Sequence, residues 1–311
     1  MGHGTTPAIA AVETEAAALF GCDSALYFGS GYWGPAILLQ GLSAHYDHII
    51  VDADSHYAIM DAIAISQKPY SHFAHRDVND LEKVLQQKLS PGQVPLLITD
   101  GVFPASGALA PLPDYQRLLQ AYSGLLCIDD AHGFGVLGKN GRGSLDYWNV
   151  DGPNSYACGT LSKAFGGHGG LITGSKALIE TLKQNSPLLN AASGVPTPIA
   201  AATAVALKLV ANDPTIRQQL ADNIAYTKAA FRVMGFDSIP DTPVPIICLG
   251  GQGLDLAALQ RQLYQQGIAV QFIPAGAYTG VPEGGALRIA LFSSHSREQL
   301  DGLLAAVKVS L

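Results

Sequence analysis

The most constraining feature of this sequence is a series of short, continuously apolar runs separated by helical patterns. The runs are ALYFG from Ala25, HIIVDA from His48, VPLLITDGVF from Val94, LLCIDDA from Leu125, SYACGTLS from Ser155 and GLITGS from Gly170. Runs without polar alternation are typical of strands buried on both faces. Helical patterns over residues 78–89, 113–122 and 176–184 lie between them. This alternation predicts an α/β fold with a mostly parallel central sheet flanked by helices.

Capping signals predict where several helices begin. Asn79, with Glu82 three residues later, is expected to cap the helix over residues 78–89. Asp213 followed by Pro214 predicts the start of another helix. Ser296 and Gln299 have the spacing of a capping box.

The last third of the chain changes character. An Ala-rich helical pattern at 197–211 precedes the strand-like segments VPIICLG, IAVQFI and ALRIALF, which alternate with helices expected from Leu254 and from Ser296. We therefore expect a large domain over residues 1–195. A smaller C-terminal α/β domain is expected over residues 196–311, beginning with a long linking helix.

Composition and charge exclude several classes of protein. Only 14% of residues are charged and the net charge is −7, with no Lys/Arg cluster, so a nucleic-acid partner is not expected. The four cysteines form no CxxC pair, which favours a reducing compartment. The N-terminal residues lack the pattern of a signal peptide, and the apolar stretch 199–211 is too short to span a membrane. We expect a soluble, cytoplasmic protein with no membrane span.

Chemically reactive side chains follow one of the apolar runs. The run from Leu125 ends in Asp129-Asp130-Ala131-His132, so a carboxylate and an imidazole stand at the carboxyl end of an expected strand. Open α/β sheets bind ligands at that edge. A capped turn explains the same residues, and so does a metal site, because Asp and His both ligate metal ions.

Lys163 lies in TLSKAFGG, close to the end of another apolar run. Burial of an ammonium is unfavourable unless the amine is neutral or covalently used. A desolvated Lys can form a Schiff base with a carbonyl cofactor, whereas the alternative is a side chain whose stem crosses the strand end into solvent. The neighbouring hydroxyls and glycines suit a phosphate close to the backbone, so we expect Lys163 in an apolar cleft.

Two further segments follow expected strands. Phe28-Gly29-Ser30-Gly31-Tyr32 enters a helix through glycines, and exposed amides at a helix N-terminus bind phosphate. A plain tight turn is the alternative. His56, in Asp54-Ser55-His56, is placed either to lie against an aromatic cofactor or to cap the helix that begins near Tyr57.

Together these segments predict one ligand. A phosphate-binding turn, a Schiff-base lysine, an acid for a pyridine nitrogen and a His for ring contact describe a pyridoxal 5′-phosphate site. A dinucleotide site fits less well, because no GxGxxG follows the first apolar run. We therefore expect pyridoxal phosphate as the cofactor, and no metal.

The motifs FGSGY, DSH, TDGVF, DDAHGFGVLG, GRGS, TLSKAFGGHGG and LRIALFSSH resemble, in order, those of the α-oxoamine synthases. The resemblance runs from about Gly4 to His295. It implies the aminotransferase-like, pyridoxal-phosphate-dependent fold type I, and a homodimer with active sites at the subunit interface.

The resemblance also implies roles for individual residues. Lys163 would be the Schiff-base lysine, Asp129 the partner of the ring nitrogen, His132 the partner of the phenolic oxygen and His56 the ring stacked on the cofactor. The phosphate would be held by Ser30, Gly31, Tyr32 and Thr160.

Two more residues follow from the same resemblance. Ser193 would lie near the segment that reaches the neighbouring subunit's phosphate, and Arg288 would bind the carboxylate of the amino acid. The implied reaction condenses a small amino acid with an acyl-CoA, usually with loss of carbon dioxide, and Lys163 removes the α-proton.

The chain departs from the family pattern at Pro104, where a serine is usual, and at Asp100, where a glutamate is usual. Two alternatives therefore stay open. One is another pyridoxal-phosphate enzyme, an aminotransferase or a lyase. The other is a partner protein built on the same fold that lacks condensing activity.

Overall fold

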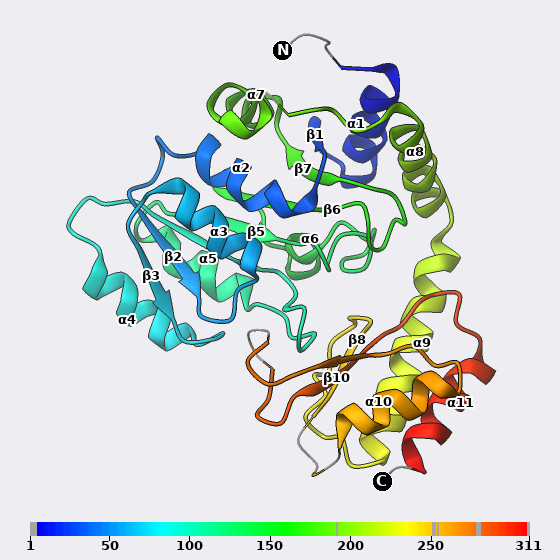
Figure 1. Cartoon of the computed structure of the whole chain (residues 1–311). Coiled ribbons are helices and arrows are strands. Elements are labelled where there is room, and N and C mark those ends of the chain that lie inside the picture. Colours follow the sequence, from blue (N-terminus) through cyan, green and yellow to red (C-terminus); the bar gives the residue numbers. More distant parts are fainter. Residues whose placement is uncertain (1–4, 191, 251–252, 254, 278–280, 310–311) are drawn as a thin grey trace. The chain divides into compact units, whose positions relative to one another are not determined.

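The computed structural model describes residues 5–190, 192–250, 253, 255–277 and 281–309, which form two compact units (Figure 1). The first unit is Met1–Val102 with Leu109–Asp213, and the second is Phe103–Ala108 with Pro214–Leu311. The chain thus leaves the first unit at Val102 and returns to it at Leu109. These two residues form an isolated antiparallel bridge.

A seven-stranded sheet in the order β1-β7-β6-β5-β4-β2-β3 is the centre of the first unit. Its strands are β1 (Ser24–Phe28), β2 (His48–Asp52), β3 (Tyr70–Phe73), β4 (Pro95–Asp100), β5 (Leu125–Asp129), β6 (Ser155–Thr160) and β7 (Gly170–Gly174). Only β7 pairs antiparallel with its neighbours, so the other six strands run in one direction. The expected mostly parallel sheet is confirmed. The edge strand β3 was not predicted.

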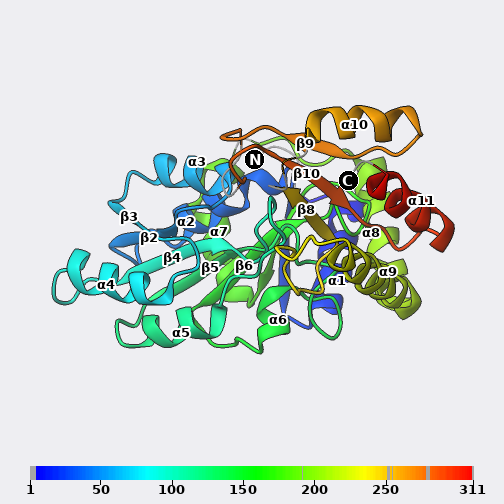
Figure 2. The same ribbon diagram turned by 90° about the horizontal axis from the view of Figure 1, so that it is seen from below.

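Helices cover both faces of this sheet (Figure 2). One face carries α2 (Gly34–Gly41), α3 (Tyr57–Ser66) and α7 (Lys176–Asn185), and the other carries α4 (Val78–Lys88), α5 (Leu112–Gln120) and α6 (Ser144–Trp148). Ile37, Leu38 and Leu39 of α2 are completely buried against the apolar residues of the strands. Burial of this kind is the main stabilising contribution to such a core.

The remaining helices of the first unit are α1 (Pro7–Phe20) and α8 (Thr197–Asn212), with the short 3-10 helices η1 (Gly31–Trp33) and η2 (Pro187–Leu189). Helix α8 packs along α1. The expected domain boundary near residue 195 therefore lies one helix before the division between the compact units. Packing of α8 against α1, rather than its sequence, makes α8 part of the first unit.

The second unit contains a three-stranded antiparallel sheet, β8 (Ile246–Gly250), β10 (Ala286–Ala290) and β9 (Gln271–Ile273), in that order. Helices α9 (Pro214–Val233), α10 (Leu256–Gln265) and α11 (Arg297–Lys308) complete its core. The loop 103–108 belongs to this unit. The Thr242 hydroxyl donates to the carbonyl of Gly107 at 2.9 Å, and Nζ of Lys228 donates to the carbonyl of Thr242 at 2.7 Å.

Helix starts agree with the sequence at Pro214 and at Ser296, and differ elsewhere. The side chain of Asp77, not of Asn79, caps α4, because it accepts hydrogen bonds from two N–H groups of the first turn. The expected start at Leu254 lies outside the described residues, and α10 begins at Leu256. No single helix of the described chain is long and apolar enough to cross a membrane; α8 and α9 reach that length and composition only when taken together.

Ser296 and Gln299 form the expected capping box at the start of α11. We expect Ser296→Ala to destabilise the second unit by about 1 kcal/mol, because an N–H of the first turn loses its acceptor. Amide hydrogen exchange of α11 should become faster, whereas Ser294→Ala, at an exposed position just before the cap, should leave it unchanged. Equal exchange in the two variants would contradict this role of the box.

Candidate active site

The carboxyl ends of neighbouring strands bring polar side chains to one edge of the first unit's sheet. Asp100 on β4 and Asp129 on β5 are paired in register, and Asp129 pairs with Cys158 on β6. Thr160 is two residues further along β6, so strand alternation places it on the same face. Open α/β sheets bind ligands at this edge.

Asp129 is the buried acid that the sequence predicted at the end of its strand. Its side chain accepts a hydrogen bond from the N–H of Ala131 at 3.2 Å. Burial raises the pKa of this carboxyl to about 6, while the positive charge of Lys163 acts in the opposite direction. A cation bound against Asp129 would favour its ionised form further.

Lys163 and His132 meet beside this acid. Nζ of Lys163 lies 2.9 Å from Nε2 of His132, so a charged Lys163 donates to the imidazole. In the single chain Lys163 is exposed, so the expectation that it lies in an apolar cleft is not met there. The reason is that Lys163 follows the end of β6 by three residues, in a bend rather than in the strand.

Hydroxyl groups gather next to the FGSGY segment. The side chain of Thr160 lies 2.7 Å from that of Ser162, and it also donates to the carbonyl of Gly169 at 3.0 Å. Gly31 packs directly on Thr160, since a Cβ at Gly31 would lie 2.6 Å from the Thr160 Cβ. The hydroxyl of Ser30 caps η1 by accepting from the N–H of Tyr32 at 3.3 Å. The four residues expected to hold a phosphate therefore lie next to one another in space.

His56 lies at the end of the loop that follows β2, as the N-cap of α3. Its half-buried ring is 6.1 Å from the ring of Tyr32, centroid to centroid. Burial lowers the pKa of His56, and the charge of Lys163 lowers it further. Both readings of His56 from the sequence are thus compatible with the structure: the residue caps a helix, and it lies close enough to Lys163 for the charge of that residue to lower its pKa.

The last two sequence-predicted residues are not part of this group. Ser193 is exposed, in an irregular segment before α8. Arg288 belongs to the second unit, on β10, where its Nε donates to the carbonyl of Pro104 at 2.7 Å. Their expected roles stay predictions. Among the described residues, no group of three or more His, Cys, Asp or Glu side chains is arranged to hold a metal ion.

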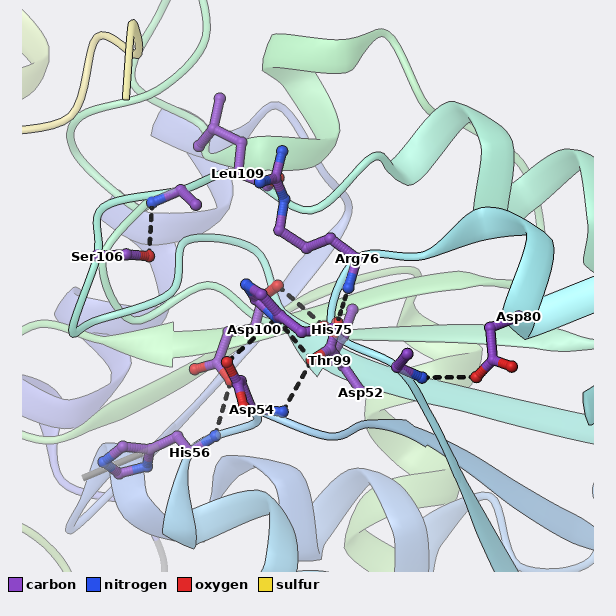
Figure 3. Close-up of polar contacts among 12 residues, drawn as sticks. Asp52, Asp54, His56, His75, Arg76, Asp80, Thr99, Asp100, Ser106 and Leu109 are labelled. Atoms are coloured by element: carbon purple, nitrogen blue, oxygen red, sulfur yellow. Dashed lines mark hydrogen bonds and ion pairs between the residues drawn. The ribbon is translucent and has the colours of Figure 1, made fainter. Parts of the chain in front are cut away.

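Sequence reasoning assigned no site role to two acids of this region. Asp52 is completely buried at the end of β2, and Asp100 ends β4 and accepts a hydrogen bond from the backbone N–H of His56 at 2.8 Å (Figure 3). A signal was present, because the apolar runs HIIVD, PLLITD and LLCID all end in Asp. Parallel strands deliver their ends to a common edge, so three such endings predict a cluster.

Asp130 has a structural role behind the site. Its carboxyl accepts from the N–H of Ser144 at 2.6 Å and occupies the space where a side chain at Gly133 or Gly143 would begin. A Cβ at Gly133 would lie 1.9 Å from Oδ1 of Asp130, and a Cβ at Gly143 would lie 2.0 Å from Oδ2. Gly133 of DDAHG and Gly143 of GRGS are therefore required by the packing of one buried carboxyl.

Comparison with known proteins gives consistent matches over nearly the whole chain. Residues 2–307 match the family model described as aminotransferase class I and II. Over 300 residues the chain is 35% identical to a protein named 8-amino-7-oxononanoate synthase from Methylococcus capsulatus. That alignment covers 96% of this chain and 76% of the relative.

Solved structures agree with the sequence matches. A serine palmitoyltransferase of Sphingomonas wittichii superposes with a TM-score of 0.90 at 26% identity, covering 99% of this chain and 77% of that one. An 8-amino-7-oxononanoate synthase from Francisella tularensis superposes with a TM-score of 0.81 at 26% identity, covering 99% and 88%. The fold that the sequence resemblance implied is confirmed.

Asp130 provides a test of the buried acids. Burial raises its pKa to about 7 from an ordinary value of 3.8, so the folded state keeps a proton that the unfolded chain has released. The contribution of Asp130 to the free energy of unfolding should therefore fall as pH rises between these values and level off above about pH 7.

Asp130→Asn should lose the part of this slope that Asp130 contributes, while Asp129 keeps its own, and should gain roughly 2–4 kcal/mol relative to the unchanged chain between about pH 4 and pH 7. Urea unfolding at several pH values measures the difference. Asp151→Asn, at an exposed position, should follow the unchanged chain. Parallel curves for Asp130→Asn and the unchanged chain would mean that Asp130 is ionised when folded.

Proposed function

Because the chain belongs to the aminotransferase class I and II family, and within it to the α-oxoamine synthases, we propose that it is a pyridoxal-phosphate-dependent acyltransferase. Its reaction joins the α-carbon of a small amino acid to the acyl group of an acyl-CoA, and releases CoA and carbon dioxide. The observation that carries this proposal is the 2.9 Å contact of Lys163 with His132, beside the buried Asp129.

The donor set of the site fits the cofactor. Pyridoxal phosphate needs an amine for its aldehyde, a carboxylate for its ring nitrogen and donors for its phosphate. Lys163 and Asp129 supply the first two groups at one strand edge, and the Thr160 hydroxyl would supply the third by turning away from the carbonyl of Gly169, to which it donates in this structure. The backbone at Gly31 and the hydroxyl of Ser30 would complete the phosphate site, because they adjoin Thr160.

When bound, pyridoxal phosphate supplies an aldehyde and a ring that accepts electrons from the α-carbon of an amino acid. Lys163 would hold this aldehyde, and would then take the α-proton onto its Nζ. His132 orients that amine through the 2.9 Å contact. Asp129 would keep a proton on the ring nitrogen, because a buried carboxylate is stabilised by an adjacent cation.

The names of the relatives suggest a first substrate pair. In 8-amino-7-oxononanoate, a keto group adjoins an amino-bearing carbon that carries a methyl group. Such a product forms when alanine loses its carboxylate and gains a seven-carbon acyl group. Alanine with a seven-carbon, ω-carboxylated acyl-CoA is therefore the pair we propose to test first.

Assembly, location and the remaining site residues are also part of the proposal. We infer a homodimer with active sites at the subunit interface, in the cytoplasm. In support, Lys163, Tyr32 and Tyr57 are exposed in the single chain although they adjoin the site. Ser193 would approach the partner's cofactor, and Arg288 would bind the amino-acid carboxylate.

Lys163→Ala tests the cofactor assignment. The unchanged chain, incubated with pyridoxal phosphate and freed of excess, should be yellow and lose its visible band on borohydride reduction. Lys163→Ala should give no borohydride-fixed cofactor and lower CoA release at least about 100-fold, because a general base contributes this much or more. Lys139→Ala, an exposed lysine on a loop, is the matched control.

CoA release is screened with glycine, alanine and serine against short, long and ω-carboxylated acyl-CoAs. Release that depends on both an amino acid and Lys163 supports the proposal. Cofactor binding without CoA release from any pair would instead favour a partner protein on this fold. Amino-group transfer to a keto acid would identify an aminotransferase.

A further inference from the structure

The ring of His56 is held by its own helix. Nδ1 of His56 accepts a hydrogen bond from the N–H of Ala58 at 3.1 Å, in the first turn of α3. A ring nitrogen that accepts a hydrogen bond carries no proton, so the proton of the neutral ring must be on Nε2. The first N–H groups of a helix have no acceptor within the helix, which makes this bond favourable.

The charges around the ring act mainly against its protonation. Lys163 lies close enough to lower the pKa of His56, in addition to the effect of burial. Asp61 acts in the opposite direction. However, the carboxyl of Asp61 already accepts the hydroxyl of Tyr32 at 2.5 Å. A neutral imidazole is the form that this environment favours.

The backbone of His56 is held from the sheet. Oδ2 of Asp100 accepts the N–H of His56 at 2.8 Å, and Asp100 is only 3% exposed (Figure 3). The same loop is held two residues earlier, where the N–H of Asp54 donates to Oδ1 of Asp52 at 2.9 Å. Asp52 is fixed in turn by the N–H of Arg76 and by Nδ1 of His75, at 2.8 Å and 2.9 Å.

We propose that Asp100 is a positioning residue that, together with the N–H of Ala58, holds His56 as a neutral ring with its proton on Nε2, facing Lys163. This inference rests on the proposed function for its purpose. A neutral imidazole can lie against a cationic cofactor ring beside the Lys163 amine, whereas an imidazolium would repel both.

Asp100 performs this role as a hydrogen-bond acceptor rather than as a charge. Burial and the neighbouring Asp129 raise the pKa of Asp100 well above its ordinary value, and Asp52 adds to the effect. The N–H of His56 and the charge of Lys163 act in the opposite direction. An amide of the same shape accepts the His56 N–H as well as a neutral carboxyl does, so Asp100→Asn should preserve the bond that Asp100→Ala removes.

The test is nitrogen NMR of the full chain with ¹⁵N-labelled histidine, without and with pyridoxal phosphate. The His56 signals among the nine histidines are assigned by their loss in His56→Gln. In the unchanged chain and in Asp100→Asn, we expect an unprotonated Nδ1 and a protonated Nε2. In Asp100→Ala the two tautomers should mix, and the dissociation constant of pyridoxal phosphate should rise about tenfold.

Asp47→Ala is the matched control. Asp47 also accepts a backbone N–H, that of Val94 at 2.9 Å, but at the opposite end of β2. It should change neither the tautomer nor the cofactor affinity. If Asp100→Ala does not fold, the unchanged chain and Asp100→Asn still decide the matter.

A protonated Nδ1 in the unchanged chain would overturn the inference. So would the same loss in Asp100→Asn as in Asp100→Ala, since the charge would then matter rather than the acceptor. The tautomer is measured without cofactor, so its outcome is separate from that of the proposed function. A chain that never binds pyridoxal phosphate would refute the function and leave the tautomer unaffected.

Discussion

The site depends on the pairing of two buried carboxyls, Asp100 and Asp129, in register on neighbouring parallel strands. Adjacent strands are about 4.8 Å apart, so two negative charges at these positions would repel each other strongly in a medium that screens little. A fold can keep such a pair only with a proton on one member or a cation beside it. Lys163 supplies the cation, and it opposes the rise in pKa of both acids. The charge of Lys163 and the protonation of Asp100 and Asp129 therefore depend on one another.

The two acids serve different elements. Asp129 faces the region of Lys163 and is available to a ligand, whereas Asp100 is engaged by the backbone of the loop that carries His56. Asp130, one residue further, holds the glycine-rich turn behind the site. Asp100, Asp129 and Asp130 follow or end two neighbouring strands, and each of them acts on a different part of the site. Asp100 and Asp129 stand on the sheet itself, which makes their positions more exact than those of groups carried by loops alone.

Much of this arrangement follows from the sequence, because apolar runs and capping residues act locally. The strands of the sheet's centre, the helix start at Ser296 and the position of Asp129 belong to this class. The edge strand β3 escaped prediction because its short sequence, YSHF, is half polar, in keeping with a strand of which half the residues are exposed. The sequence shows that Asp100 ends an apolar run, but only the strand register shows that it lies beside Asp129, and only the bend after β6 shows that Lys163 is exposed. These are tertiary facts, which no local pattern contains.

The loop 103–108 has a consequence for how this chain is made. It departs from the first unit between Val102 and Leu109, yet its carbonyl groups are bound by Thr242 and Arg288, which are synthesised more than a hundred residues later. During synthesis these carbonyl groups therefore have neither of these two partners until the C-terminal third of the chain has been made. The polypeptide also crosses between the units three times, at 102–103, 108–109 and 213–214. A single cut between Asp213 and Pro214 would consequently leave the second unit covalently incomplete, since its segment Phe103–Ala108 would stay attached to the first unit.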